Sequence, residues 1–252
     1  AYDIIIQAMS GLMSITGPGP GQPTRVGTSI ADLVAALFTV IGILAALNDR
    51  NRTGLGQMVD VAMLDCQLAL LENALARYFA TGEDPVPLGN RHPSITPFSS
   101  FNAADGQFVL AMGNNSLWQT FCNAVARPAL LEDPRFADNA SRTTHWAELH
   151  QILEELFRTK TVAEWLELLG SHGIPCGPIN TISAVASDPH VQERGMVVEL
   201  VDQEAGPVKM AGLPIKFSRS RCTIDKPAPG LGAHTVEVLS SLARHGHNTD
   251  KT

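Results

Sequence analysis

The chain has 252 residues, of which 44% are hydrophobic and 17% charged, and its formal net charge is −7. This composition is typical of a globular protein with a large core, in one domain or two, and it excludes a largely disordered chain. The acidic balance argues against nucleic acid as a main partner, while local basic groups remain free to hold an anionic ligand.

The apolar segments and the cysteine spacing predict where in the cell the protein is located. No secretory signal peptide is recognisable, and the apolar run 33–47 is shorter than the roughly 18 residues of a membrane span, so we expect no membrane partner. The chain begins without Met inside an apolar run, so we expect further residues upstream. The cysteines are far apart and form no C-x-x-C motif, which favours reduced thiols in a cytoplasmic protein: they are Cys66, Cys122, Cys176 and Cys222.

Helices are predicted for most of the first third of the chain. The loop that follows the first helix contains prolines, which have no N–H to donate, so it is not a phosphate-binding loop. In chain order the predicted elements are a helix in 2–16, a turn-rich loop in 17–23, a long and buried apolar helix in 30–48, a polar turn in 48–56, a strand in 57–62 and a helix in 63–81.

The rest of the chain alternates helical periods with short strands, which predicts an α/β fold. Thr161 and Glu164 have the spacing of a capping box. After a linker in 82–87 the predicted elements are a hairpin of 99–102 and 107–112, helices in 116–125, 147–157 and 161–172, a sharp loop in 173–180, a helical turn in 182–186, a hairpin of 197–202 and 208–211, and a last helix in 235–244.

One charged residue, Asp32, lies in the first turn of the long apolar helix. Ser29 and Asp32 have the S-x-x-D spacing of a capping box, in which the two side chains satisfy backbone N–H groups of the first turn. The alternative is that the helix start holds an ionised, nucleophilic carboxylate beside a substrate site. Both roles are compatible, because the helix dipole and its N–H groups position an anion and keep it charged.

Other reactive groups have no recognisable local motif. The eight histidines show no H-E-x-x-H, so we expect no metal site. No G-x-S-x-G or cysteine-nucleophile motif is present. His92 lies in an irregular Gly/Asn/Pro loop, where binding groups are often found. Asp3 either caps the first helix or has a functional role. By themselves these patterns do not separate an enzyme from a helical interaction domain.

A series of segments points further. They include Ile30-Ala-Asp32, Gly89-Asn-Arg-His-Pro93 and Leu231-Gly-Ala-His-Thr235, and they occur in one order along nearly the whole chain. Together with 1–17, 41–47, 53–57, 61–65, 173–180 and 188–191, they resemble the class III CoA-transferase family, which includes formyl-CoA transferase, carnitine CoA-transferase and α-methylacyl-CoA racemase.

The resemblance implies a covalent mechanism at Asp32, the position of the family's catalytic aspartate. The carboxylate would attack an acyl-CoA and pass through an aspartyl anhydride and an aspartyl-CoA thioester to a carboxylic acid acceptor. The coenzyme A thioester is then a substrate, and no bound cofactor is expected. The residues that the resemblance assigns to substrate and CoA binding are Met63, Asp3, Gln7, Asn90 and His92.

The start of the chain favours a transferase over a racemase. At the start of this segment the racemase branch of the family has a sequence similar to Gly-His-Asp-Ile, whereas this chain has Ala-Tyr-Asp-Ile. The phenol of Tyr2 is a poor base near neutral pH. Succinyl-CoA or a similar donor is expected. The alternatives are a racemase-type isomerase and a non-catalytic fragment or subunit that needs a partner chain.

The resemblance also implies an incomplete fold. Residues 1–82 and 196–252 would form the catalytic-helix part, the linkers and the tail of a large Rossmann-like domain, and 83–195 a smaller α+β domain. The N-terminal half of the large domain, which supplies most CoA contacts in the family, is absent from the sequence. The family forms interlocked dimers, so a homodimer is expected.

Overall fold

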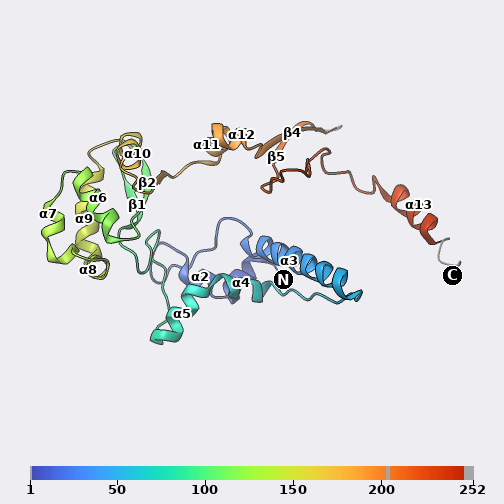
Figure 1. Ribbon diagram of the computed structural model, residues 1–252, viewed down its shortest axis with the longest axis horizontal. Helices are drawn as coiled ribbons and strands as arrows, with labels where there is room; N and C mark the ends of the chain where they lie inside the picture. Colours follow the sequence, from blue (N-terminus) through green and yellow to red (C-terminus); the bar gives the residue numbers. More distant parts are fainter. Residues whose placement is uncertain (1, 203–204, 247–252) are drawn as a thin grey trace. The chain divides into compact units, whose positions relative to one another are not determined.

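The computed structural model describes residues 2–202 and 205–246, with side chains described as far as residue 242. The chain forms two compact units, 1–179 and 180–252. Helices predominate and the strands are short, which confirms the predicted α/β class (Figure 1).

The N-terminal segment forms two short helices, α1 (Asp3–Met9) and α2 (Leu12–Ile15). A single helix over 2–16 was expected, and the break lies at Gly11. This glycine has φ 87°, a left-handed conformation that glycine adopts readily and that interrupts a regular helix.

The long helix α3 spans Ile30–Thr53 and continues through the segment where a polar turn was predicted. The extension is favourable because Arg50 and Arg52 lie in the last turn, at the negative end of the helix dipole. Arg52 also pairs with Asp49 at 2.9 Å. The helix ends at Gly54, whose φ is 78° and whose N–H donates to the carbonyl of Arg50.

The prediction that the apolar helix is buried is wrong for this chain. Ala31 and Val34 are buried, but Leu37 is 63% exposed and Ile41 60%. By length and composition α3 is the one helix in the described ranges that could cross a membrane, a test that the core helix of a soluble protein also passes. So large an apolar face is typical of a surface that another protein segment covers. Its other exposed apolar residues are Leu33, Phe38, Val40, Ile43, Leu44 and Leu47.

Two helices follow, α4 (Met63–Leu70) and α5 (Glu72–Thr81), where one was expected. The helix α4 packs against both α1 and α3. The predicted strand 57–62 is irregular, since none of the described strands pairs with it. Val59 of this segment packs closely against Gly42 of α3. A Cβ atom added to Gly42 would lie 2.8 Å from Val59 Cγ1.

A small antiparallel sheet lies beyond the linker, with strand order β1-β2-β3. The predicted hairpin is confirmed as β1 (Phe98–Asn102) and β2 (Gln107–Ala111), and Phe101 lies opposite Phe108. The third strand, β3 (Cys176–Pro178), pairs with β2 inside the segment that was predicted to be a loop. Three residues carry too little alternation to be recognised as a strand.

Helices pack on this sheet and enclose the main hydrophobic core (Figure 1). The predicted capping box is confirmed: the Thr161 hydroxyl accepts from the N–H of Glu164, whose carboxylate accepts from the N–H of Thr161. The helices are α6 (Asn115–Ala124), α7 (Ala129–Glu132), η1 (Pro134–Phe136), α8 (Asn139–Thr144), α9 (Trp146–Phe157) and α10 (Val162–Ser171). Large core side chains include Phe101, Phe108, Trp118, Phe121, Phe157 and Trp165.

A fully buried arginine, Arg142, ties α8 to the start of the sheet. Its guanidinium donates to the carbonyls of Thr96 and Phe136 at 2.8 and 3.0 Å and to Asn115 Oδ1 at 2.8 Å. Burial lowers the pKa of this guanidinium. Because its N–H groups are matched to neutral acceptors, the charge is held without an ion pair in the described residues.

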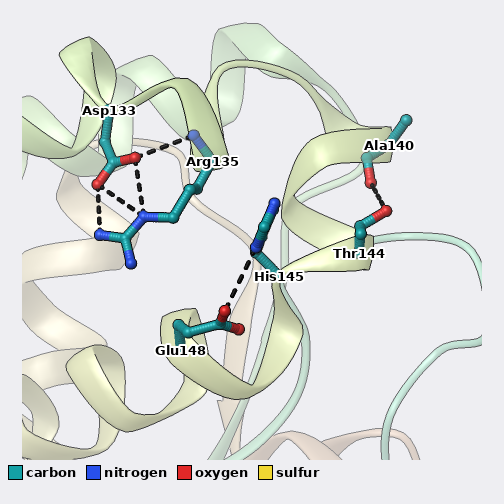
Figure 2. A network of polar contacts seen from close by, with 6 residues as sticks. All are labelled: Asp133, Arg135, Ala140, Thr144, His145 and Glu148. Carbon is teal, nitrogen blue, oxygen red and sulfur yellow. Dashed lines mark hydrogen bonds and ion pairs between the residues drawn. The ribbon is translucent and has the colours of Figure 1, made fainter.

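Polar contacts on the surface of the same region are shown in Figure 2. Arg135 donates to both carboxylate oxygens of Asp133, with a shortest distance of 2.7 Å, and His145 contacts Glu148 at 3.3 Å. The hydrogen bonds from Arg135 lower the pKa of Asp133, and the same pair raises the pKa of Arg135. The pair of Arg135 and Asp133 is an ion pair at the surface, which stabilises a fold only modestly.

The second unit consists of short elements. The helices α11 (Ile182–Ser187) and α12 (Pro189–Glu193) are capped by the side chains of Thr181 and Asp188. The second predicted hairpin is confirmed as β4 (Val197–Asp202) and β5 (Gly206–Ala211), although β5 already begins at Gly206, where the turn was predicted. The last helix, α13, spans Thr235–Gly246. The predicted division at 82/83 and 195/196 stays a prediction.

Candidate functional site

Asp32 lies in the first turn of α3 and its side chain is exposed. The predicted capping box with Ser29 is wrong: Ser29 is the N-cap residue, but it makes no side-chain capping hydrogen bond. In the described part of the chain the Asp32 carboxylate has no hydrogen bond or ion pair with another residue. It therefore lies unengaged at the positive end of a 24-residue helix.

The side chain that caps α3 comes from α1. Asp3 Oδ1 accepts from the backbone N–H of Ala31 at 2.9 Å, although the two residues are 28 positions apart. The expectation that Asp3 caps its own helix is wrong, since the N-cap position of α1 is Tyr2 and it makes no side-chain capping bond. The second oxygen of Asp3 accepts from Gln7 Nε2 at 2.8 Å.

Gln7 extends this connection to the loop before α3. Its amide is fully buried, and its Oε1 accepts from the N–H of Val26 at 2.9 Å. Asp3 and Gln7 thus fix the approach of the chain to α3 from one face of α1, as their separation of four residues allows. The structure brings Asp3 and Gln7 to the turn that carries Asp32, and their role in substrate or CoA binding stays a prediction.

Two further predicted residues lie on neighbouring elements. Met63 is the first residue of α4 and is half-buried. Asn90 lies in the loop before β1, is exposed, and donates from Nδ2 to Ser100 Oγ at 2.9 Å. Neither Met63 nor Asn90 makes a hydrogen bond to Asp32 in the described residues. The role of both residues in CoA binding stays a prediction.

His92 is held in the same loop by its own backbone and ring. Its N–H donates to the carbonyl of Phe98, and its Nδ1 accepts from the N–H groups of Ser94 and Ile95 at 3.2 and 3.1 Å. The ring packs on Phe98 with 5.2 Å between centroids. Burial and then the positive charge of Arg77 lower the pKa of His92. Its neutral form is therefore favoured near pH 7.

Arg77 and Arg91 line a cavity with His92, and neither was singled out from the sequence. Arg77 lies on α5 in a segment whose pattern indicated only a helix. Arg91 lies inside the Gly89–Pro93 motif, but no pairing partner is adjacent in sequence to reveal its environment. A single arginine without a local partner carries little sequence signal, because its role depends on which segments fold around it.

No group of three or more His, Cys, Asp or Glu side chains is arranged to hold a metal ion within the described residues. All four cysteines are free thiols. The first turn of α3 presents the exposed carboxylate of Asp32, while the neighbouring N–H groups of Ile30, Ala31 and Leu33 donate to protein oxygens.

Comparison with known proteins identifies relatives of this chain. The chain is 37% identical over 241 residues to a succinate–glutarate CoA-transferase of Agrobacterium fabrum, with 96% of this chain and 60% of that protein covered. It is 41% identical over 245 residues to an acetyl-CoA:oxalate CoA-transferase of Acetobacter aceti, of which it covers 62%. The chain thus spans about 60% of the length of the curated relatives that it matches.

The fold also matches solved structures over nearly all of this chain but only part of theirs. A CAIB/BAIF family protein from Brucella suis superposes with a TM-score of 0.79 at 36% sequence identity, covering 96% of this chain and 63% of that one. Residues 1–235 match the family description "CoA-transferase family III". The chain therefore belongs to CoA-transferase family III, with the incomplete fold that its coverage of the relatives implies.

Proposed function

We propose that this chain is the part of an acyl-CoA:carboxylate CoA-transferase that carries the nucleophile, Asp32. Relatives are named as transferases between CoA thioesters and carboxylic acids, with succinyl-CoA and acetyl-CoA among their named donors. The observation that carries the proposal is the exposed Asp32 carboxylate in the first turn of α3, a helix already capped by Asp3.

In the proposed first half-reaction an Asp32 oxygen attacks the thioester carbonyl carbon of the donor. The new C–O bond forms as the C–S bond breaks, so that CoA leaves as a thiolate and an acyl–aspartyl anhydride remains. The thiolate then attacks the Asp32 carbonyl carbon. This step releases the donor acid as a carboxylate and leaves an aspartyl-CoA thioester.

The second half-reaction repeats these steps in reverse order. The acceptor carboxylate attacks the Asp32 carbonyl carbon and displaces the CoA thiolate, which leaves a second mixed anhydride. The thiolate attacks the acceptor's carbonyl carbon, so the new acyl-CoA is released and the Asp32 carboxylate is restored. Each tetrahedral intermediate carries an oxyanion. In the first turn of α3 the N–H groups of Ile30, Ala31 and Leu33 already donate to protein oxygens, so we take the N–H of Asp32 as the donor for that oxyanion.

The proposed enzyme includes more than this chain. We propose that the apolar face of α3, with Leu37 and Ile41 largely exposed, packs against chain that the relatives possess and this one lacks, or against the second subunit of a homodimer. The missing part would also supply most CoA contacts. We propose a cytoplasmic location, which the four free thiols support.

A racemase is the second candidate within the family, and Tyr2 weighs against it. Its phenol is 82% exposed and has no carboxylate partner in the described residues that would help it remove a proton. Deuterium exchange at the α-carbon of a branched acyl-CoA, in the absence of an acceptor acid, would identify a racemase instead.

The test is covalent trapping in a protein that spans the full length of its relatives. After addition of an acyl-CoA, hydroxylamine should convert Asp32 to a hydroxamate detectable by peptide mass spectrometry, and Asp32→Asn should abolish both the adduct and transfer. Glu237, an exposed carboxylate in the first turn of α13, provides the matched control as Glu237→Gln. Normal transfer by Asp32→Asn would refute the proposal.

A further inference from the structure

A cavity of about 270 Å³ lies where the junction of α4 and α5 meets the loop before β1. Its wall is apolar over much of its area, with Ile15, Leu70, Leu71 and Leu88 among the lining residues. Its polar side chains are Asn73, Arg77, Arg91 and His92. No aspartate or glutamate of the described residues lines it, so the polar part of the cavity is positively charged or neutral.

The Nε–H group of each arginine has no acceptor among the described residues. The Nε atoms of Arg77 and Arg91 are buried and have no hydrogen-bond partner, and neither residue forms an ion pair within the described ranges. A buried guanidinium N–H without an acceptor is unfavourable, so such groups are normally matched by an acceptor. An anion in the cavity would provide one.

Arg91 is also held in place before any ligand arrives. Its Nη2 donates to the carbonyl of Thr143 at 3.1 Å, and its guanidinium lies 5.0 Å from the ring centroid of Trp146. These contacts fix the side chain from the neighbouring helical region. Binding to a preorganised arginine loses less side-chain freedom than binding to a mobile one.

His92 supplies a further donor of defined type. Because its Nδ1 accepts two backbone N–H bonds, the neutral ring carries its proton on Nε2, which is then a donor. Burial, and then the charge of Arg77, lowers the pKa of this ring, and the second effect is expected where positive groups share one site without an anion. A bound anion would reverse that effect.

We propose that this cavity binds the carboxylate of a short-chain organic acid, with Arg77 and Arg91 facing the carboxylate and the leucine wall facing the carbon chain. A guanidinium fork matches the planar carboxylate. The cavity volume of about 270 Å³ corresponds to roughly nine water molecules at about 30 Å³ each. It lies below the volumes of pockets that hold drug-sized ligands, which begin at about 300 Å³. The family resemblance assigns His92 to substrate or CoA binding, whereas no motif and no comparison assigns a role to Arg77 or Arg91, and the proposal holds whether or not Asp32 is the nucleophile.

The first test uses the 252-residue chain and observes the ring resonances of His92 by NMR during titration with glutarate. We expect a saturable shift of His92 and a rise in its pKa, with no shift of the exposed His172. Butyrate should bind more tightly than acetate, because the longer chain buries more apolar surface on the leucine wall. Absence of a saturable shift at His92 would refute the site without affecting the proposal for Asp32.

Substitutions provide the second test. Arg77→Met should weaken glutarate binding by roughly 10-fold or more, since a charge-assisted hydrogen bond is lost, and Arg77→Lys should restore part of it. The control is Arg127→Met, an exposed arginine outside the cavity, with unchanged binding. Circular dichroism verifies that each variant folds. Equal weakening by Arg77→Met and Arg127→Met would overturn the proposal.

Inorganic phosphate separates the two sources of an oxyanion, an organic acid and a phosphate group of CoA. If glutarate displaces phosphate and binds more tightly, the carboxylate assignment is supported. If phosphate binds more tightly than every acid in the series and shifts the same His92 resonances, the carboxylate assignment is wrong and the cavity is a phosphate site.

Discussion

The Asp3 carboxylate accepts a hydrogen bond from the backbone N–H of Ala31 at 2.9 Å, one residue before Asp32. The first turn of α3 is therefore capped from another helix, and the carboxylate of Asp32 inside that turn has no partner among residues 2–202 and 205–246. A nucleophilic carboxylate must keep its oxygen lone pairs available, and a capping role would occupy them. Division of these two tasks between Asp3 and Asp32 suits a reactive group at a helix start.

Asp3→Ala should destabilise the first unit by about 1 kcal/mol, the usual effect of removing a capping side chain. Asp3→Asn should lose less, because its amide oxygen can still accept from Ala31. Urea unfolding monitored by circular dichroism measures the difference. If Asp3→Ala unfolds at the wild-type urea concentration, the bond to Ala31 contributes nothing to stability.

Arg142→Met should lower the free energy of unfolding by about 2–6 kcal/mol, because it leaves the buried carbonyls of Thr96 and Phe136 without donors, at about 1–3 kcal/mol each. The control is Arg135→Met, which breaks the exposed pair with Asp133 (Figure 2) and should change stability little. Chemical denaturation of both variants provides the comparison. Similar losses in the two would show that burial of Arg142 is unimportant.

Acid should destabilise the small sheet region through exposed carboxylates with lowered pKa values. The pKa of Asp133 is lowered by the side-chain hydrogen bonds of Arg135, and that of Glu164 by the backbone N–H of Thr161. A lowered folded-state pKa contributes stability above the unfolded value, near pH 4, and this stability is lost as pH falls through the folded value.

The measurement is the free energy of unfolding between pH 5 and pH 3. Asp133→Asn should flatten the dependence on pH, because it removes one of the groups that titrates differently in the two states. An identical dependence in the variant and the wild type would contradict the assignment to Asp133.

Thiol reactivity should follow exposure. Cys222 is exposed, whereas Cys122 is fully buried and burial raises its pKa to about 12. The thiolate is the reactive form, so a maleimide at pH 7 should label Cys222 first and Cys122 only after unfolding. Mass spectrometry of Cys222→Ser verifies the order. Rapid labelling of Cys122 in the folded chain would contradict its burial.

Polar substitution on the exposed face of α3 tests whether that face is an interface. Leu37→Gln and Ile41→Gln should each change the stability of this chain by less than about 0.5 kcal/mol, as expected for surface positions. The same changes should weaken assembly of the longer protein, measured by analytical ultracentrifugation. Leu149→Gln, at a fully buried position, is the destabilising control. Unchanged assembly would argue that α3 faces solvent in the complete protein.

Local features could be predicted from the sequence because neighbouring residues determine them. The capping box at Thr161 and Glu164 and the hairpin of β1 and β2 depend on short-range hydrogen bonds and alternation, and both are present. The family also followed from short motifs in order along the chain. The ends of helices were less predictable: α3 extends to Thr53 because its last turn is stabilised by charge, which a polar composition alone does not reveal.

What the sequence by itself determined is therefore the family, the position of Asp32 at the start of an apolar helix, and most local elements. The tertiary structure decided which side chain caps that helix, that the helix is exposed in this chain, and that Arg77, Arg91 and His92 share one cavity. The physical reason is distance along the chain. Asp3 and Ala31 are 28 residues apart, and no local propensity encodes a contact that exists only after the segments have packed.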